Sequence, residues 1–282
     1  MTDKTILITG CSSGIGYDAA HGLRQQGWRV FATCRSEADA ARLETEGLES
    51  WRLDYDDAHS IGNGLEEALS RSGGTLDAVF NNGAFALPGL IEDLPTDGLR
   101  AIFETNLFGQ HELTRRVIPV MRAQGHGRIL LNSSVLGFAA LPWRGAYNST
   151  KYALEGYADT LRRELRLSPI DVVLIQPGPI TARIRQNSIP HFERWIRPET
   201  SALASEYERR LKPRLYDEST DRDLFELPPA AVTRAVHRAL TARHPKPRYR
   251  ITTPTKIAAL MRRLFPTGLQ DRILGDTPGG TP

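Results

Sequence analysis

A tyrosine and a lysine four residues apart form the first pair in this sequence that could move a proton. They are Tyr147 and Lys151 of the segment YNSTK. Side chains at positions i and i+4 of a helix lie on one face. A free phenol titrates near pH ~10, and a neighbouring ammonium lowers that pKa toward the range that proton transfer at neutral pH requires. Tyr147 is therefore a candidate general acid/base, and Lys151 is the candidate group that lowers its pKa. The alternative is a surface pair on an amphipathic helix, because this spacing is common by chance.

A serine hydroxyl is expected near the same reacting group. Ser134 directly follows the apolar run RILLNS and lies thirteen positions before Tyr147. If that run is a parallel strand, both residues lie at the carboxyl edge of the sheet, where ligands bind. A hydroxyl there can donate to a carbonyl oxygen as that oxygen gains negative charge. Ser133 is an alternative candidate, and an ordinary turn serine is the non-catalytic interpretation.

A glycine-rich turn, TGCSSGIG at residues 9–16, follows the first apolar run. Gly10 permits a tight turn, Gly14 lets the backbone approach a pyrophosphate, and Gly16 lets a helix pack closely on the strand. The N-terminus of that helix offers free N–H groups and a positive dipole end to phosphates. An ordinary turn between strand and helix is the alternative. The position of this turn, in the first crossover, predicts a dinucleotide site.

Strands and helices alternate along the chain, which predicts how these residues are positioned. Val/Ile/Leu-rich runs predict parallel strands covered on both faces. We therefore expect an α/β fold: a doubly wound, parallel Rossmann sheet of about seven strands with helices on both faces. The predicted strands are 5–9, 29–34, 50–53, 77–81, 128–133, 171–176 and 248–252. The predicted helices are 17–26 (closed by Gly27), 37–46, 58–70, 96–123, 147–167 and 229–243, with an amphipathic helix within 255–274.

No linker divides the chain, so residues 1–275 are expected to form one nucleotide-binding domain. The charged segment 183–226 loosens the alternating pattern and is expected to be a substrate-loop insertion. Residues 276–282 (DTPGGTP) have the composition of a disordered tail. The basic, amphipathic helix within 255–274 is expected to pack at a subunit interface or over the substrate cleft. Contact with a membrane surface is the less favoured alternative.

Bulk composition excludes several other functions. The 282 residues include 36 basic and 33 acidic ones, a net charge of +3 that does not call for nucleic acid as a partner. Two cysteines make no disulfide framework, and the seven histidines show no metal-ligand spacing, so no metal is expected. We find neither a signal-peptide pattern nor an apolar run near the roughly 18 residues of a membrane span. A cytoplasmic location is the expectation.

The ordered set of motifs resembles the short-chain dehydrogenase/reductase family. The matching features are the glycine-rich turn, NNGA at 81–84, Asn106, Ser134, the Tyr147/Lys151 pair and the Pro177-Gly178 dipeptide. They span residues 4–181. The turn and the segment KYALEG at 151–156 are similar to the hydroxysteroid and retinol dehydrogenase branch. One departure is the order Gly83-Ala84, where the family usually has alanine and then glycine.

The resemblance implies a role for each matching residue. Tyr147 would be the acid/base, and Lys151 would hold the nicotinamide ribose and lower the tyrosine pKa. Ser134 would orient the substrate oxygen, and Asn106 would complete a proton relay. Read alone, Asn106 is as readily a core-bonded asparagine, and Asp54 as readily a strand-end cap as an adenine contact. The implied cofactor-binding residues are Gly10, Ser12, Ser13, Gly14, Ile15, Gly16, Arg35, Ser36, Asp54, Asn82, Gly83, Tyr147, Lys151, Pro177, Gly178, Ile180 and Thr181. Asn82 would also stabilise the central sheet.

The end of the second predicted strand indicates the form of the cofactor. NAD-specific folds place a carboxylate there for the ribose 2′-hydroxyl. Here Arg35 follows the strand and no acid appears before Glu37. A guanidinium can bind a 2′-phosphate through charge-assisted hydrogen bonds, with Ser36 and Ser13 as further donors. The sequence favours NADP(H) over NAD(H). The alternative is that Glu37 turns back to the ribose.

Apolar residues near the predicted site favour a hydrophobic substrate, such as a steroid, retinoid, fatty or aromatic alcohol or carbonyl compound. Core packing is the alternative for each. The candidate wall residues are Phe85, Leu87, Leu136, Trp143, Phe192, Trp195, Ile196 and Leu203. The resemblance also implies a homo-dimer or homo-tetramer, since the family usually pairs its two long helices across a two-fold axis. Two other functions compete with an oxidoreductase: a non-catalytic NADP(H)-binding sensor, and an epimerase or dehydratase. The four catalytic residue types argue against the sensor, and the glycine spacing argues against the epimerase.

Overall fold

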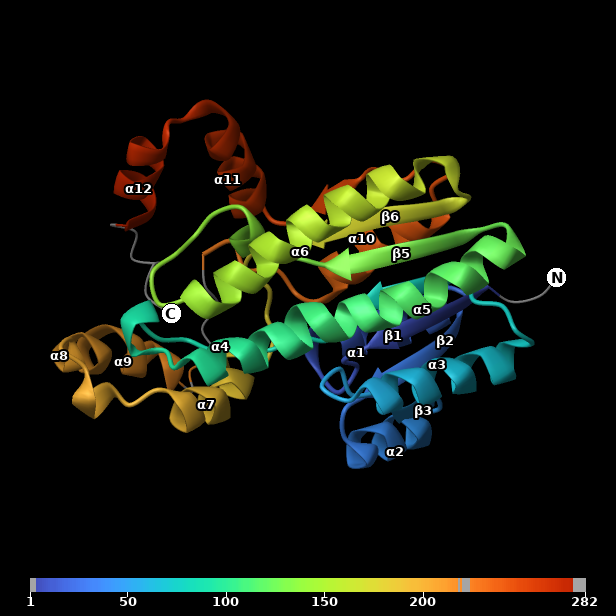
Figure 1. Ribbon diagram of the computed structural model, residues 1–282, viewed down its shortest axis with the longest axis horizontal. Helices are drawn as coiled ribbons and strands as arrows, with labels where there is room; N and C mark the ends of the chain where they lie inside the picture. The colour runs from blue at the N-terminus through green and yellow to red at the C-terminus, as the bar shows by residue number, and fades with distance from the viewer. Residues whose placement is uncertain (1–3, 218, 220–223, 276–282) are drawn as a thin grey trace.

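The computed structural model describes residues 4–217, 219 and 224–275 (Figure 1). Seven parallel strands form one sheet in the order β3-β2-β1-β4-β5-β6-β7. This confirms the predicted doubly wound fold. The strands are β1 Thr5–Thr9, β2 Arg29–Cys34, β3 Glu49–Arg52, β4 Ala78–Asn81, β5 Gly127–Asn132, β6 Ile170–Gln176 and β7 Arg248–Arg250. The predicted tail, 276–282, lies outside the described residues.

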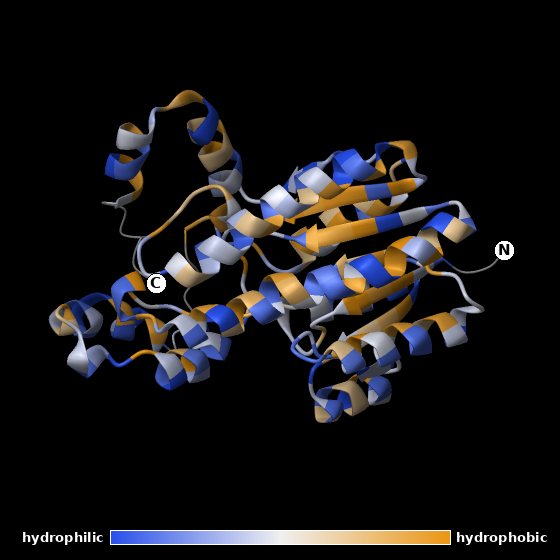
Figure 2. Ribbon diagram, in the orientation of Figure 1, coloured by the Kyte–Doolittle hydropathy of each residue, from blue (hydrophilic) through white to orange (hydrophobic). Residues whose placement is uncertain are grey.

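Helices cover both faces of the sheet, and each face has its own apolar core. Because side chains alternate along a strand, Ile6 and Ile8 of β1 face one core while Leu7 faces the other. The first core is closed by α1 (Gly14–Gln25), α2 (Glu37–Thr45) and α10 (Ala230–Thr241). The second is closed by α3 (Ala58–Ser72), α5 (Gly109–Gln124) and α6 (Gly145–Glu164). Figure 2 shows the strands as the most continuously hydrophobic part of the chain, as burial on both faces requires.

The strand order reverses beside β1, which pairs with β2 on one side and β4 on the other. The crossovers leaving β1 and β4 therefore run to opposite faces of the sheet. Such a switch point leaves a crevice outside the carboxyl ends of the strands, where dinucleotides bind in this type of fold. The glycine-rich turn and the NNGA loop both begin at this edge.

Two predicted helices are interrupted. The segment 96–123 consists of α4 (Thr96–Phe103), a π-helical turn η2 (Glu104–Phe108) and α5. The segment 255–274 consists of α11 (Thr253–Leu264) and α12 (Thr267–Gly275). The second break has a local cause, because Pro266 disfavours helical geometry at Phe265, which is extended (φ −103°, ψ 139°). Gly27, the predicted stop of α1, has the expected positive φ of 84°.

The region 183–217 consists of short helices that pack over the carboxyl edge of the sheet. They are α7 (Ile184–Trp195), η5 (Pro198–Thr200), α8 (Ala204–Glu206), η6 (Tyr207–Leu211) and α9 (Lys212–Leu215). Tyr207 anchors them, since its fully buried hydroxyl donates to Asp93 (2.7 Å) and accepts from the Leu90 amide (3.0 Å). Beyond β7, α11 and α12 extend from the body as an arm (Figure 1). No helix among the described residues is long and apolar enough to cross a membrane.

Candidate active site

The glycine-rich turn has the close backbone approach that the sequence predicts. Gly10 has φ +68°, and a Cβ placed on it would lie 2.7 Å from the Cα atom of Gly83. A Cβ on Gly16 would overlap the carbonyl oxygen of Gly10. Helix α1 begins at Gly14, and its N-cap residue Ser13 makes no side-chain capping hydrogen bond. The first-turn N–H groups are therefore available to an anion, and this cradle fits a dinucleotide pyrophosphate.

Asn82 joins three strands beside this turn. Its amide nitrogen donates to the carbonyl of Thr9 (2.9 Å), and its amide oxygen accepts from Asn132 (2.8 Å). The Gly83 amide donates to the Thr9 hydroxyl (3.1 Å), so the exchanged Gly-Ala order still fits the loop against β1. The sequence did not reveal that the Thr9 hydroxyl also bonds the buried hydroxyl of Tyr55 (2.8 Å).

The segment after β6 lies between the glycine-rich turn and the serine loop. The Pro177 carbonyl accepts from the Val135 amide (2.8 Å), and the side chain of Ala182 lies 3.3 Å from the point where Gly14 would carry a Cβ. A Cβ on Gly178 would overlap the Thr252 hydroxyl, so the chain passes there only as glycine. Ile180 and Thr181 are held by a bridge to Leu227. Pro177, Gly178, Ile180 and Thr181 thus lie at the predicted cofactor edge.

Tyr147 and Lys151 lie in the first half of α6, and both are buried. The Lys151 ammonium nitrogen donates to the Asn132 carbonyl at the end of β5 (2.7 Å) and lies 5.4 Å from the centroid of the Tyr147 ring. That bond draws the lysine toward the carboxyl edge of the sheet. The structure therefore brings the predicted pair together beside the strand that leads to Ser134.

Burial dominates the ionisation of both groups. Burial lowers the pKa of Lys151 to about 7, opposed by Glu155. Burial raises the pKa of Tyr147 to about 12, opposed by the positive charge of Arg144 and by the Ser134 hydroxyl. Lys151 is not among these causes, so the expectation that it lowers the tyrosine pKa stays a prediction. A lysine with a pKa near 7 carries only part of a charge at neutral pH, and Arg144 is the cation that acts on the phenol.

The two adjacent serines have different surroundings. Ser134 caps the short helix η3 (Val135–Gly137), where its hydroxyl accepts from the Leu136 amide (3.1 Å), and it is the serine that acts on Tyr147. The hydroxyl of Ser133 is buried with no hydrogen-bond partner among the described residues, and it lies against Gly137. Of the two candidates, Ser134 is the one beside the phenol.

Asn106 lies in the π-helical turn, with its side chain wholly buried. Its amide oxygen accepts from the Phe85 amide (3.0 Å), and its amide nitrogen donates to the Phe85 carbonyl (2.9 Å) and to Thr150 (3.2 Å). The side chain thus ties the loop after β4 to α6, as the core-bonded alternative predicted. π-Helical turns often occur at functional sites. The proton relay through Asn106 stays a prediction.

Comparison with known proteins agrees with this geometry. The family model for short chain dehydrogenase matches residues 4–192. This chain belongs to the short-chain dehydrogenase/reductase family. It is 36% identical to "Uncharacterized oxidoreductase YbbO" of Escherichia coli (strain K12), with 96% of this chain and 94% of that protein covered. It is 30% identical to "Retinol dehydrogenase 16" of Mus musculus, with 97% and 88% covered. A solved short-chain dehydrogenase from Streptomyces avermitilis matches with a TM-score of 0.76 and 25% identity, with 98% and 94% covered.

The three residues expected to bind the adenosine part of the cofactor differ in how free their side chains are to do so. Arg35 is exposed just after β2, whereas Ser36 caps α2 by accepting from the Asp39 amide (3.4 Å). Asp54 is engaged within its own loop, since its carboxylate accepts from the Asp56 amide (3.2 Å) and pairs with Arg52 (3.4 Å). The strand-end-cap alternative therefore describes the Asp54 side chain in this structure.

Arg42 is a neighbour of the glycine-rich turn that the sequence did not reveal. Its guanidinium donates to the Ser12 carbonyl (2.7 Å) and pairs with Glu46 (2.7 Å). Nothing in the sequence pattern marks this arginine, because it lies on α2, thirty residues after Ser12. It places an ion-paired guanidinium against the backbone of the glycine-rich turn.

Most of the predicted substrate-wall residues form one apolar cluster over Tyr147. The Phe85 ring stacks on His191 of α7 with centroids 3.8 Å apart, and the Trp143 ring meets Tyr207 edge-on. Leu203 does not belong to this cluster, since it is 42% exposed. The cluster also packs the short helices onto the sheet. Core packing and a substrate wall, the two interpretations that the sequence left open, are therefore both compatible with it. Its members include Phe85, Leu87, Trp143, Phe192 and Ile196, with Leu136 and Trp195 partly buried against them.

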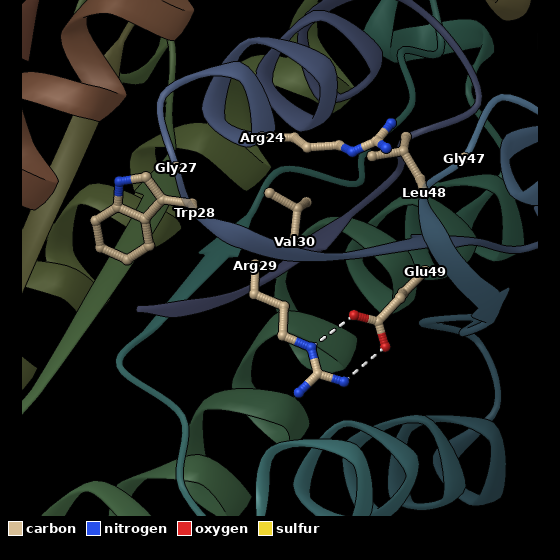
Figure 3. Close-up of a pocket in the computed structure, with 8 residues that line it drawn as sticks. All are labelled: Arg24, Gly27, Trp28, Arg29, Val30, Gly47, Leu48 and Glu49. Carbon is tan, nitrogen blue, oxygen red and sulfur yellow. Dashed lines mark hydrogen bonds and ion pairs between the residues drawn. The ribbon is translucent and has the colours of Figure 1, made fainter. Parts of the chain in front are cut away.

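A separate pocket of about 310 Å³ lies at the opposite edge of the sheet (Figure 3). Its wall includes Trp28 and Val30, and a two-bond ion pair joins Arg29 to Glu49 (2.6 and 2.9 Å). Arg29 is the first residue of β2, so this pocket is at the amino ends of the strands. Ligands of such folds bind at the carboxyl ends, which leaves the pocket outside the candidate active site.

Proposed function

We propose that this protein is an NADP(H)-dependent oxidoreductase that transfers hydride between the nicotinamide and a hydrophobic alcohol or carbonyl compound. The observation that carries the proposal is the buried Tyr147 beside Ser134, at the sheet edge where the glycine-rich turn opens. The name of the mouse relative, a retinol dehydrogenase, supports an apolar alcohol as the substrate class. The apolar cluster around Tyr147 supports the same class.

Each residue has a defined task in this reaction. The nicotinamide, when bound, supplies or accepts the hydride. The Ser134 hydroxyl donates to the substrate oxygen and positions it against the phenol. In reduction, the Tyr147 hydroxyl gives its proton to the oxygen that becomes the alcohol; in oxidation, the phenolate takes that proton. Lys151, whose ammonium donates to the Asn132 carbonyl at the end of β5, would hold the nicotinamide ribose.

Replacing Tyr147 by phenylalanine tests the catalytic assignment. The ring would still fill its buried space, but no proton could be transferred, so we expect kcat to fall by about 10²–10⁴-fold. The measurement is turnover with NADPH over a panel of apolar ketones and aldehydes, with NADPH affinity measured in parallel as the control for folding. A variant that keeps more than about a tenth of wild-type kcat would remove Tyr147 from the mechanism. A wild-type protein that binds NADPH and turns over nothing would favour the sensor alternative.

The preference for NADP(H) rests on Arg35. Its positive charge helps to hold the pKa of His191 at about 4, behind the main effect of burial. His191 in turn stacks on Phe85 of the loop after β4. The Arg35 charge therefore acts along the carboxyl edge of the sheet, where a 2′-phosphate would lie.

Replacing Arg35 by alanine tests this preference. We expect NADPH to bind about tenfold more weakly, because a charge-assisted hydrogen bond is lost, and NADH affinity to change by less than about twofold. Titration of both cofactors into the variant and wild type measures this. Arg24→Ala, at the opposite edge of the sheet, is the matched control. Equal NADH and NADPH affinity in wild type would overturn the NADP(H) assignment.

A further inference from the structure

The arm formed by α11 and α12 carries large apolar side chains on a side that faces water. Ile257, Leu260 and Leu264 of α11 recur at intervals of three and four residues, so they lie on one face of the helix. Each of the three is more than half exposed. An amphipathic helix on a globular protein normally turns such a face toward the core. The exposed apolar face of α11 therefore requires another explanation.

The opposite face of α11 makes the contact with the body of the protein. Thr255 and Ala259, two positions before and after Ile257, point to nearly the opposite side of the helix, and they are buried and partly buried. The hydroxyls of Thr255 and Thr252 lie together (2.9 Å) against Gly178, where a Cβ would overlap both. The helix also contacts η3, directly after the serine loop. Small residues thus fix α11 at the edge of the sheet that holds the candidate active site, and its apolar face points away from the body.

The turn after α11 and the helix α12 add to the exposed apolar surface of the arm. Phe265 in the turn and Leu269 on α12 are both exposed. Gln270 is buried between the two helices, where its side-chain amide donates to the Phe265 carbonyl (2.7 Å) and its backbone amide to the Pro266 carbonyl (3.2 Å). These bonds hold α12 against the turn. Figure 2 shows hydrophobic and hydrophilic residues interleaved along the whole arm.

Positive charge accompanies these apolar side chains. Residues 253–275 include four basic residues and one acidic residue, which gives the arm a net charge of +3. The basic residues are Lys256, Arg262, Arg263 and Arg272, and the acidic one is Asp271. Lys256 and Arg263 are exposed and lie four positions before and three after Leu260, so they border the apolar face. Such side chains can lay their alkyl stems along apolar surface while their charges reach an anionic group.

An apolar face bordered by positive charge matches the surface of a membrane that contains anionic lipids. A second copy of the arm fits this face less well. Two-fold pairing would bring the same basic residues of both copies together. A stable protein interface also takes roughly 20–30 residues from each partner, whereas the arm offers only a few exposed apolar side chains.

We propose that the arm docks this protein on an anionic membrane surface. The apolar face of α11 enters the boundary between headgroups and acyl chains, and Lys256 and Arg263 bind lipid phosphates. Attachment by such short helices is peripheral and reversible. Because α11 begins against Gly178, docking would keep the candidate active site close to the membrane, where apolar compounds collect. The proposal does not depend on the reaction that the site performs.

Co-sedimentation of the full chain with lipid vesicles tests this docking. Vesicles of phosphatidylcholine alone are compared with vesicles of equal parts phosphatidylcholine and phosphatidylglycerol, which add negative charge. We expect wild type to bind the anionic vesicles about tenfold more tightly than the neutral ones, because basic side chains gain energy only near the charged surface. Added salt should reduce this preference by screening the charges.

Two pairs of matched variants test whether the arm makes the contact. Arg263→Gln should weaken binding to anionic vesicles about fivefold, whereas Arg122→Gln, at an exposed position of α5, should not. Leu260→Asp should weaken it about tenfold or more, because an apolar contact becomes a repelled charge. Leu167→Asp, at an exposed leucine outside the arm, should bind as wild type. Circular dichroism checks that all four variants fold.

The outcomes distinguish the membrane from other occupants of the arm. Wild type that binds neither kind of vesicle, or both equally, would overturn the proposal. Arm variants that bind anionic vesicles as tightly as wild type would also overturn it. If wild type ignores vesicles and Leu260→Asp lowers its mass in light scattering, the arm is a contact between copies and membrane docking is contradicted. None of these results depends on turnover, so the oxidoreductase function is tested separately.

Discussion

The residues of the candidate site are governed by burial more than by their mutual charges. Tyr147 and Lys151 are both removed from water, and each is pushed toward its neutral form. A neutral phenol with a raised pKa is a proton donor in reduction. Of these two groups and Arg144, only the arginine therefore keeps its full charge at neutral pH.

The depressed pKa of Lys151 makes the stability of the protein depend on pH. Its pKa is about 7 in the folded protein and 10.5 ordinarily, so between these values the unfolded chain holds more protons than the folded one. Stability therefore rises with pH across this window, and the full penalty applies below pH ~7. We expect the free energy of unfolding of wild type, relative to Lys151→Met, to rise by up to about 1.4 kcal/mol per pH unit.

Urea unfolding of both proteins without cofactor, at about pH 7, 8 and 9, measures this difference. Lys256→Met serves as the charge-removal control, because Lys256 is exposed on α11. The control should show a difference from wild type that does not change with pH over this range. A constant difference for Lys151→Met as well would mean that the buried lysine keeps an ordinary pKa.

Residue chemistry was predictable from the sequence where a motif is local. Tyr147 and Lys151 lie four residues apart, and the glycine-rich turn is continuous. The charged neighbours of Arg144 were not predictable, because Arg185 and Arg214, whose charges lower its pKa, come near it only through the tertiary fold. The same holds for the bonds of Tyr207 to Asp93 and Leu90, which join residues more than a hundred positions apart.

At the scale of elements, strands were predicted better than helix boundaries. Strands buried on both faces are continuous apolar runs, so β1 and β2 match their predicted bounds. The predicted helix 96–123 missed the π-helical turn, since that turn accompanies bonds from Asn106 to Phe85 and Thr150 that no local pattern encodes. The break at Pro266 could have been predicted from the proline alone.

The elements also determine which side chains reach the site. The loop after β4 is held by Asn106, the loop before α6 by Gly89, and the short helices by Tyr207. These ties converge on one apolar cluster that contains Tyr147. Under the proposed function, the substrate would contact loops and short helices carried by a rigid sheet, an arrangement in which substrate range can change while Tyr147 and Ser134 stay in place.

At the scale of the whole molecule, α4, α5 and α6 present a common outer surface (Figure 1). Phe108, between α4 and α5, is 50% exposed and lies beside Phe103, with ring centroids 6.2 Å apart. The other apolar surface is the arm, where Leu260 is 59% and Leu264 62% exposed. Exposed apolar side chains that gather in this way commonly mark contacts with other molecules.

We propose that the protein is a homo-dimer or homo-tetramer that pairs through α5 and α6. Two-fold symmetry would bring Phe108 of each copy into the same interface, where it loses its exposure to water. Light scattering at micromolar concentration should give at least twice the 31.4 kDa of one chain. Phe108→Asp should lower that mass, because an unpaired carboxylate in the interface costs more than the lost apolar contact. Leu260→Asp, on the arm, should leave it unchanged. If Leu260→Asp alone dissociates the assembly, the arm forms the interface, and a wild-type mass of one chain would contradict oligomerisation altogether.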